Sequence, residues 1–361
     1  LRPGSFLRID SDGVEREERY WNPVIATNQE MGVEEAIEGA RERLFRAVEL
    51  RLRSDVPIAF CMSGGVDSVS LISIARRVFD YDVHGFTIVN TDSRYEESEM
   101  VAHAVAELGI QHTSVPLRRT GFLDGLRELI GYHDAPVYTL TYYMHWRLLE
   151  EIARHGYRIS VSGTAADELF SGYFDHHLAY LYEIQSDREA LDRAVADWQE
   201  SVLPIVRNQH LRDPMLFINN PQFRDHIYHG SSVFQTYLHE PWEDPFTEEH
   251  FTDDLLRNRM LNELFHETVP VILHEDDLNS MYHSVENRSP YLDRELFNFC
   301  CSIPTRHLVK AGRAKAVLRA AMSGIAPARI LENPRKVGFN APIQDLLDTN
   351  EPSVRAELLD D

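Results

Sequence analysis

The sequence predicts an α/β protein: a parallel, twisted sheet with helices on both faces, and a C-terminal half that is mainly helical. Two observations lead to this prediction. Between residues 57 and 162, short apolar runs alternate with amphipathic helical segments across short links, which is typical of a parallel sheet covered on both sides. Beyond about residue 175 the strand signals fade, and helical stretches punctuated by proline replace them.

The elements follow in chain order. Residues 1–23 predict a short β segment with a glycine turn, and apolar side chains at helical spacing predict a helix over residues 32–53. Strands are predicted at residues 57–62, 84–90, 112–117 and 157–162. Helices are predicted at residues 68–78, 96–108, 121–131, 140–155, 190–202 and 253–266. Ligands of open parallel sheets bind at the carboxyl ends of the strands, so a site is expected in the loops that follow them.

Charge and composition exclude several classes of protein. The chain has 361 residues, with 36 Lys and Arg against 58 Asp and Glu, and its net charge of −22 argues against binding nucleic acid through a broad basic surface. No apolar run approaches the roughly 20 residues that span a bilayer. The cysteines Cys61, Cys300 and Cys301 show neither metal-ligand nor CxxC spacing, which favours a reducing, cytoplasmic compartment.

The first strand runs into a loop with the composition of an anion cradle. Ser63, Gly64 and Gly65 stand between this strand and its helix. Backbone N–H groups, the helix N-terminus and the hydroxyls of Ser63 and Ser68 can all face a phosphate there. Asp67 would repel a bare phosphate, which indicates a Mg²⁺ ion between them. A structural Gly-Gly turn capped by Ser or Asp would have the same sequence. The loop alone therefore does not distinguish an anion-binding loop from such a turn.

A second strand ends in the same way. Ser162 and Gly163 close the strand at residues 157–162, and Asp167 follows at the start of a predicted helix. If the two strands are neighbours, Asp67 and Asp167 face one crevice, which is the arrangement that Mg²⁺ with a polyphosphate needs. The alternative is that Asp167 only balances the N-terminal dipole of its own helix.

Four ordered blocks resemble the asparagine synthetase family. Residues 63–68 (SGGVDS) and 162–173 (SGTAADELFSGY) resemble two blocks of its ATP-pyrophosphatase (PP-loop) synthetase domain, and the fold implied is that of the adenine nucleotide alpha hydrolases. Residues 277–293 resemble the family's D-x-x-S-M segment, and residues 315–342 resemble its K-x-x-L-R and K-x-G-F tail.

The resemblance implies a reaction and a set of residues. ATP activates a carboxylate as an acyl-adenylate, pyrophosphate leaves, and ammonia then attacks to give an amide. The implied ATP-binding residues are Cys61, Ser63, Gly64, Gly65, Asp67, Ser68, Gly163 and Lys315, and the implied Mg²⁺ ligands are Asp67 and Asp167. The implied catalytic residues are Asp67, Lys315 and Lys336, and the two cations suit the charge that builds on pyrophosphate and on the oxyanion.

The distribution of lysine agrees with these assignments. Among the 36 basic residues only Lys310, Lys315 and Lys336 are lysine, and the last two fall where the resemblance requires lysine. A compact ammonium is not interchangeable with a planar guanidinium at a crowded phosphate. Genome bias towards arginine explains why lysine is scarce, but it does not explain these two positions.

The block at residues 277–293 is less specific. Glu286 and Arg288 are expected in the wall of the active site or in the core, with no preference between the two. Tyr282 and His283 are expected to pack against their neighbours, although a neutral histidine could also serve as a base.

One position departs from the family pattern. Asparagine synthetases carry Glu after the Ser-Gly of the second block, whereas this chain has Thr164. A threonine hydroxyl does not take up a proton at neutral pH, so aspartate as the acceptor is in doubt while ATP chemistry is not. The alternatives are a sugar uronate in polysaccharide biosynthesis, a natural-product intermediate, or closure of the substrate's own amide, as in the β-lactam synthetases.

Partners follow from the same resemblance. Residues 1–30 resemble the linker after the family's glutaminase domain, so that domain is expected to be detached or removed, and residues 31–361 are expected to form the synthetase domain. Nitrogen would come from glutamine through such a domain or subunit, or from ammonia. A small carboxylate is the expected substrate, with no nucleic acid and no membrane, and a homodimer is compatible with the sequence. Two alternatives stay open: a PP-loop ligase or thiolase acting on tRNA, and a non-catalytic relative that binds a nucleotide.

Overall fold

A computed structural model describes residues 1–89, 97–117, 120–227, 231–240, 247–335 and 343–358. The chain forms two compact units. The sheet unit comprises Ile37–Ala166, Val271–Leu296 and Leu318–Asp361, and the helical unit comprises Leu1–Ala36, Asp167–Pro270 and Phe297–Val317. Each unit therefore combines segments that are far apart in the sequence. The expected division into residues 1–30 and 31–361 stays a prediction.

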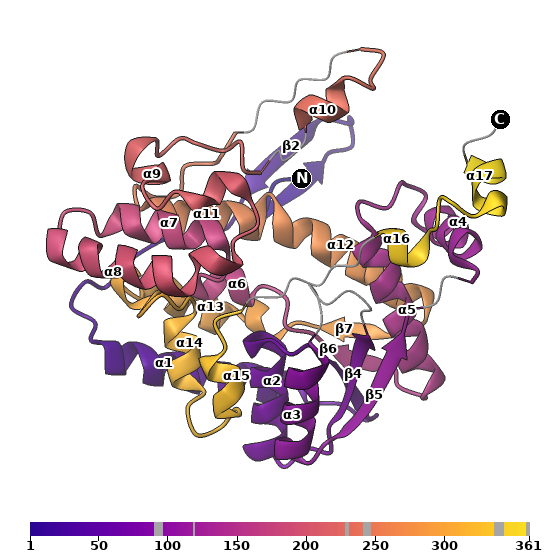
Figure 1. Ribbon diagram of the computed structural model, residues 1–361, viewed down its shortest axis with the longest axis horizontal. Helices are drawn as coiled ribbons and strands as arrows, with labels where there is room; N and C mark the ends of the chain where they lie inside the picture. Colours follow the sequence, from indigo (N-terminus) through magenta and orange to yellow (C-terminus); the bar gives the residue numbers. More distant parts are fainter. Residues whose placement is uncertain (90–96, 118–119, 228–230, 241–246, 336–342, 359–361) are drawn as a thin grey trace. The chain divides into compact units, whose positions relative to one another are not determined.

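The sheet unit contains a five-stranded parallel sheet (Figure 1). Its strands are β3 (Ile58–Cys61), β4 (His84–Val89), β5 (Gln111–Pro116), β6 (Ile159–Val161) and β7 (Glu286–Arg288), in the order β5-β4-β3-β6-β7. All four pairings are parallel. The predicted fold class is therefore confirmed.

The chain reverses its direction across the sheet between β3 and β6. From β3 it moves outward to β4 and β5, and it then returns to the other side of β3 as β6. Phe60 of β3 and Val161 of β6 are register partners, so the carboxyl ends of these two strands are adjacent. A reversal of this kind opens a crevice at the carboxyl ends, which is where ligands of open α/β sheets bind.

Helices bury both faces of the sheet. The helices wholly or mostly in this unit are α1 (Val33–Arg51), α2 (Val66–Arg77), α3 (Ser98–Leu108), α4 (Phe122–His133), α5 (Leu140–Arg154), α12 (Thr268–Tyr282), α14 (Ala316–Ala321), α15 (Ala328–Glu332), α16 (Ile343–Leu346) and α17 (Pro352–Leu358), with the 3-10 helix η3 (Pro290–Leu292). α2 packs against β3, whereas α5 packs against β4 and β5. Successive side chains of a strand point to opposite faces, and Ile58, Ala59 and Phe60 are all buried, so both faces of β3 are covered.

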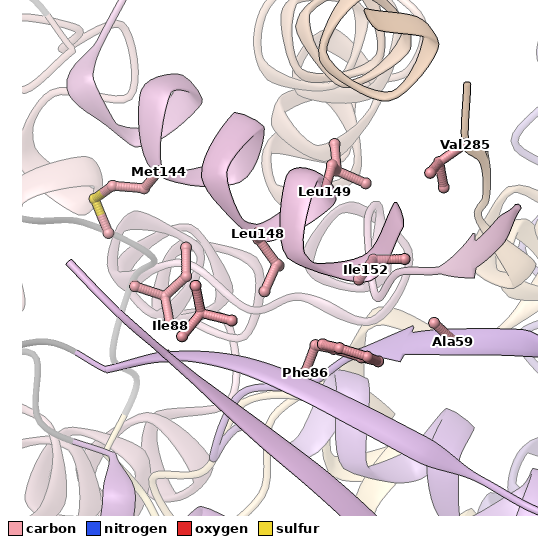
Figure 2. Packing of buried hydrophobic residues seen from close by; sticks show 9 residues of the cluster. Ala59, Phe86, Ile88, Met144, Leu148, Leu149, Ile152 and Val285 are labelled. Atoms are coloured by element: carbon pink, nitrogen blue, oxygen red, sulfur yellow. The ribbon is translucent and has the colours of Figure 1, made fainter. Parts of the chain in front are cut away.

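One face of the sheet carries a continuous apolar core, shown in Figure 2. The cluster consists of Met144, Leu148, Leu149 and Ile152 of α5 with Ala59, Phe86, Ile88, Val115 and Val285. The four side chains of α5 recur at positions i, i+4, i+5 and i+8, so they share one side of the helix. This core holds β3, β4 and β5 in register, and it thereby sets where their carboxyl ends present the following loops.

The helical unit begins with a β-hairpin, as residues 1–23 predict. β1 (Ser5–Ile9) and β2 (Glu15–Arg19) pair antiparallel. Asp10 closes the turn by accepting hydrogen bonds from the N–H groups of Asp12 and Val14 at 3.0 and 2.9 Å. The remaining elements are α6 (Ala166–Phe170), α7 (Phe174–Glu183), α8 (Arg188–Ser201), η1 (Leu203–Ile205), η2 (Gln209–Arg212), α9 (Leu216–Asn219), α10 (Ser231–Gln235), α11 (Leu255–Phe265), α13 (Arg294–Ser302) and η4 (Thr305–His307).

Two of the differences from the sequence prediction concern the strands and helices next to the site. No strand is predicted beyond residue 175, but β7 pairs with β6, with Arg288 opposite Val161. Its residues Glu, Asn and Arg are polar and lie at the edge of the sheet, so they show no apolar pattern. α2 begins at Val66, two residues earlier than predicted, because the Val66 side chain is buried. Residues 90 and 96, the ends of one predicted strand and one predicted helix, lie outside the described residues.

In the described part of the chain, no helix combines the length and the apolarity that crossing a bilayer requires.

Candidate functional site

Two serines hold the loop between β3 and α2 closed. The Oγ of Ser63 accepts a hydrogen bond from the N–H of Gly65 at 3.2 Å, and the Oγ of Ser68 accepts one from the N–H of Ser63 at 3.0 Å. The two hydroxyl oxygens lie 3.0 Å apart and share a further hydrogen bond. Gly65 is the N-cap of α2 and has no side chain to cap it, so the N-terminal N–H groups can receive an anion.

Two glycines of this region are required by close approach. A Cβ on Gly64 would lie 2.8 Å from the Cβ of Met100, in α3. A Cβ on Gly163 would lie 3.2 Å from the Cβ of Asp67 and 3.2 Å from the backbone N of Ser68. The loops after β3 and β6 are therefore in direct contact, as neighbouring parallel strands require.

A chain of hydrogen bonds runs along the end of β6. The Oγ of Ser160 donates to the Oδ1 of Asn287 at 3.0 Å, and the amide of Asn287 donates to the Oγ of Ser162 at 3.2 Å. The Oγ of Ser162 in turn lies 3.1 Å from the Oγ1 of Thr164. Thr164, the position that departs from the family pattern, is thus held by neutral groups alone in this chain of contacts.

Cys61 ends β3 and is not a nucleophile at neutral pH. Burial, and then the charge of Asp276, raise the pKa of its thiol to about 12, and a hydrogen bond with Ser160 opposes this shift only in part. Its side chain is therefore a thiol rather than a reactive thiolate. The backbone contact with a nucleotide that the resemblance implies for Cys61 stays a prediction.

In the helical unit, Asp167 and Lys315 form an ion pair. Asp167 lies in the first turn of α6, and the Nζ of Lys315 is 2.8 Å from its Oδ1, with side chains that are 17% and 6% exposed. Gly172 lies beside the pair, and its N–H donates to the backbone carbonyl of Asp167 at 3.1 Å. A Cβ on Gly172 would lie 1.6 Å from the Oδ1 of Asp167, so no larger residue fits beside the pair.

The backbone around this ion pair is strained. The φ angle of Lys315 is +57° and that of Ser171 is +69°, both in the left-handed region that residues other than glycine rarely adopt. The two residues are joined directly, because the N–H of Lys315 donates to the carbonyl of Ser171 at 3.1 Å. Such strain persists only where the surrounding structure enforces it, and here it fixes the position of Lys315 opposite Asp167.

Sequence reasoning missed a buried pair next to Asp167. The hydroxyl of Tyr173 donates to the Oε1 of Glu168 at 2.6 Å, and Glu168 is 4% exposed. Burial, and then the neighbouring Asp167, raise the pKa of Glu168 to about 7. The available signal was a glutamate directly before the apolar Leu169 and Phe170, since charged residues are seldom buried without a partner.

A second buried cluster of the helical unit surrounds Arg259. Asp175, His176 and Glu263 offer ligand atoms within 4.8 Å of one another, which is close enough to hold a metal ion. Arg259 already supplies positive charge there, at 3.0 Å from Glu263 and 3.8 Å from Asp175. Burial alone would raise the pKa of Asp175, but the hydrogen bond from His226 and the charges of His176 and Arg259 hold it well below its usual range. The cluster is therefore an ion-pair network rather than a metal centre.

The block at residues 277–293 takes structural roles in the sheet unit. Arg288 donates to the backbone carbonyl of Arg51, the last residue of α1, at 2.8 Å and to the carboxylate of Glu286 at 2.7 Å. The ring of His283 packs 5.5 Å from that of Trp146, as predicted, and burial lowers the pKa of His283 to about 4. This histidine is therefore neutral at pH 7.

The structure brings together many of the predicted site residues. Cys61, Ser63, Gly64, Gly65, Asp67, Ser68 and Gly163 lie at the adjacent carboxyl ends of β3 and β6. Asp167 and Lys315 pair with each other in the helical unit. Asp67 and Asp167 belong to different units, and their expected pairing on one Mg²⁺ stays a prediction. Lys336 lies outside the described residues.

Comparison with known proteins identifies the family. Residues 39–361, most of the chain, match the asparagine synthase family. The chain belongs to the asparagine synthase family. It is 26% identical over 377 residues to asparagine synthetase (glutamine-hydrolyzing) 1 of Bacillus subtilis, a match that covers 96% of this chain and 56% of that protein. The sequence resemblance seen in the four blocks is therefore confirmed.

Two further similarities are weaker. The chain is 22% identical over 389 residues to amidase chry2 of Gibberella zeae, covering 93% of this chain and 57% of that protein. It spans about half the length of the curated relatives it matches. Among solved structures, the U34-tRNA thiolase NcsA from Methanococcus maripaludis aligns with a TM-score of 0.27 and 11% identity, over 70% of this chain and 78% of that one. A likeness of this size is too small to bear on the fold or the function.

The donor chemistry fits the ATP and Mg²⁺ that the asparagine synthase family implies. The loop after β3 offers hydroxyls, N–H groups and a helix N-terminus to a polyphosphate. Gly163 leaves open a space beside Asp67 that a Cβ would fill. Asp67 and Asp167 supply carboxylate oxygens, the hard ligands that Mg²⁺ prefers, and Lys315 supplies a compact cation.

Proposed function

We propose that the chain is an ATP-dependent, amide-forming synthetase that adenylates a carboxylate, releases pyrophosphate and joins the acyl group to ammonia. The contact of two Ser-Gly loops at the reversal point of the sheet supports this most strongly. There a Cβ on Gly163 would lie 3.2 Å from the Cβ of Asp67 and 3.2 Å from the backbone N of Ser68, so glycine keeps this space open. A polyphosphate would meet N–H groups, hydroxyls and the start of α2. Membership of the asparagine synthase family supports the class of reaction.

The residues have distinct parts in this proposal. Ser63 and Ser68, whose hydroxyls fix each other at 3.0 Å, bind the departing pyrophosphate. Asp67 and Asp167 would hold Mg²⁺, which when bound neutralises charge on the phosphates. Lys315 adds a cation, carried on a backbone held in a strained conformation, and a cation beside the phosphates lowers the barrier to their departure. Lys336 is proposed, from the sequence, to stabilise the oxyanion during amide formation.

The acceptor is proposed to be a carboxylate other than aspartate. Thr164 stands where asparagine synthetases carry Glu, and its hydroxyl lies 3.1 Å from that of Ser162 at the end of a neutral hydrogen-bond chain. A neutral group binds the ammonium of an amino acid more weakly than a carboxylate does. The similarity to an amidase beside the asparagine synthetases also supports a different acceptor. A sugar uronate and a natural-product intermediate are the candidate classes.

The nitrogen is proposed to come from glutamine, as ammonia released by a glutaminase domain or subunit. The Bacillus subtilis relative is named as glutamine-hydrolyzing, and the chain covers 56% of its length. Adding glutamine in place of ammonia to the chain as given is the direct test. We expect amide formation with ammonia alone, and amide formation with glutamine would place the glutaminase activity in this chain instead.

The main experiment measures pyrophosphate release by the full chain with Mg²⁺, ATP, ammonia and a panel of carboxylic acids that includes aspartate. We expect release with an acid other than aspartate, and a fall of about 100-fold in Asp67→Asn, which removes one charge and keeps the shape. Asp80→Asn is the matched control, because the Asp80 side chain is 95% exposed. Rapid asparagine formation would overturn the proposed acceptor. No release with any acid would instead favour a non-catalytic relative that binds a nucleotide.

A further inference from the structure

The Asp167–Lys315 pair puts an ammonium on the oxygen that the proposed reaction assigns to a metal. The Nζ of Lys315 lies 2.8 Å from the Oδ1 of Asp167. We propose that Lys315 is a built-in substitute for the metal ion: its ammonium neutralises Asp167 in the ligand-free protein, and a divalent cation binds Asp167 only by displacing it. This inference rests on the proposed function in one respect, namely that Asp167 is a metal ligand.

The packing around the pair makes the two cations exclusive. A Cβ on Gly172 would lie 1.6 Å from the Oδ1 of Asp167 and 2.4 Å from the Cε of Lys315, so both side chains are pressed against the Gly172 backbone. Mg²⁺ binds oxygen at about 2.0–2.1 Å, closer than an ammonium does. Two cations on one enclosed carboxylate repel each other, so the ammonium has to leave when the metal arrives.

The movement needs only the side chain of Lys315. Its backbone is fixed on both sides, because its N–H donates to Ser171 at 3.1 Å and the N–H of Ala316 donates to Leu308 at 3.0 Å. The lysine side chain has a flexible four-carbon stem, so its ammonium can swing while the backbone stays in place. The displaced ammonium then pairs with the phosphates that arrive with the metal. One exchange would thus couple metal binding to nucleotide binding.

The neighbouring carboxylate of Glu168 does not take the place of Asp167 in this exchange. Glu168 accepts the hydrogen bond of Tyr173 at 2.6 Å and is buried, so it is committed to a different partner. It also adds a carboxyl group beside Asp167, which makes a cation at Asp167 more favourable. Lys315 is therefore the residue to replace in order to test the exchange.

The test titrates Mn²⁺ alone, without nucleotide, into the full chain and follows free Mn²⁺ by electron paramagnetic resonance. Lys315→Met keeps an unbranched apolar stem and removes the charge, and we expect it to bind Mn²⁺ at least about tenfold more tightly than the unmodified chain. The gain should vanish in the double variant Asp167→Asn with Lys315→Met. Lys310→Met is the matched control, since Lys310 is exposed in the same segment. Equal or weaker binding by Lys315→Met overturns the proposal.

Loss of one member of a buried ion pair also lowers the free energy of unfolding, so Lys315→Met is expected to be less stable without metal. If Lys315→Met is unfolded without metal, Mn²⁺ should restore its cooperative thermal transition, and a variant that stays unfolded at saturating Mn²⁺ overturns the proposal. The measurement contains no ATP and no acceptor. Its result is therefore separate from a failure of the proposed function, which would appear as an absence of pyrophosphate release by the unmodified chain.

Discussion

The hydroxyl of Tyr291 donates a hydrogen bond to the backbone carbonyl of Asp67 at 3.0 Å, although 224 residues separate the two in the sequence. The ring of Tyr291 is fully buried in the sheet unit. The block at residues 277–293 therefore contacts the loop that follows β3, and it holds the first turn of the helix that carries Asp67. This contact gives a physical reason for the two motifs to occur together in one chain.

Tyr291→Phe removes this hydrogen bond and keeps the ring. We expect the free energy of unfolding to fall by about 1 kcal/mol and pyrophosphate release to fall several-fold, because Asp67 loses a contact that fixes its position. Chemical denaturation and the release assay measure the two effects. Tyr138→Phe, at a side chain that is 67% exposed, should change neither. Normal turnover in Tyr291→Phe would mean that Asp67 is positioned without this bond.

Gly172→Ala should abolish activity. A Cβ at Gly172 would overlap the Oδ1 of Asp167 at 1.6 Å, so the ion pair with Lys315 cannot form, and the loss of such a buried pair costs about 3–5 kcal/mol. Gly131→Ala is the matched control in α4, because a Cβ there meets open space among the described residues. That control should stabilise the protein by about 0.5–1 kcal/mol. Equal thermal stabilities of the two variants would contradict the geometry of the pair.

Arg259→Met should destabilise the helical unit strongly. Arg259 pairs with Glu263 at 3.0 Å and with Glu267 at 2.9 Å, and its side chain is 2% exposed. Without it Glu267 loses its arginine partner, and Asp175 and Glu263 keep only their histidine partners, His226 and His176. We expect this loss to cost about 3–5 kcal/mol. Arg193→Met removes an exposed arginine and should cost less than about 0.5 kcal/mol. Denaturant titration measures the stability of both variants. Similar unfolding midpoints for Arg259→Met and Arg193→Met would contradict this account of the network.

His283 should make the protein less stable in mild acid. Burial lowers its pKa to about 4, with the hydrogen bond to the Trp146 backbone opposing the shift, Arg147 adding to it and Glu128 opposing it. The unfolded chain takes up this proton near pH 6.5 and the folded chain does not, so the contribution is complete above pH 6.5 and is lost as the pH falls towards 4. We expect a loss of about 1–2 kcal/mol between pH 7 and 5. His283→Phe should flatten this part of the stability profile, and an unchanged slope would assign the effect to other groups.

Lys336→Arg should fold normally and lose most of its activity. The substitution keeps the charge and replaces a compact ammonium by a planar guanidinium, and the two groups are not interchangeable beside a phosphate or an oxyanion. Circular dichroism checks the fold and pyrophosphate release checks the activity. Lys310→Arg, at an exposed side chain, is the control. Normal turnover by Lys336→Arg would make the position of this lysine a coincidence.

Much of the fold could be predicted because local pattern and final structure agree. The runs at residues 57–62 and 157–162 contain β3 and β6, since a strand buried on both faces is mainly apolar. The one polar residue of β6, Ser160, is buried with a hydrogen bond to Asn287. β7 could not be predicted in this way. Its three polar residues form a strand only because β6 offers them a free edge, and that information comes from the tertiary structure.

The candidate site was predictable to the extent that it depends on strand ends. The two Ser-Gly loops could be placed together because parallel strands end on one side of a sheet, and the contact of Gly163 with Asp67 agrees with this. The buried pairs could not be predicted. His176 meets Glu263 across 87 residues of sequence, and no local pattern specifies which carboxylate a histidine will meet.

The ion pair of the helical unit also has a consequence for synthesis of the chain. Lys315 is translated about 150 residues after Asp167, which at about 5–20 residues per second is an interval of about 7–30 s. Asp167 is therefore made well before its ion-pair partner. The ion pair therefore cannot stabilise the helical unit until the segment that carries Lys315 has been made.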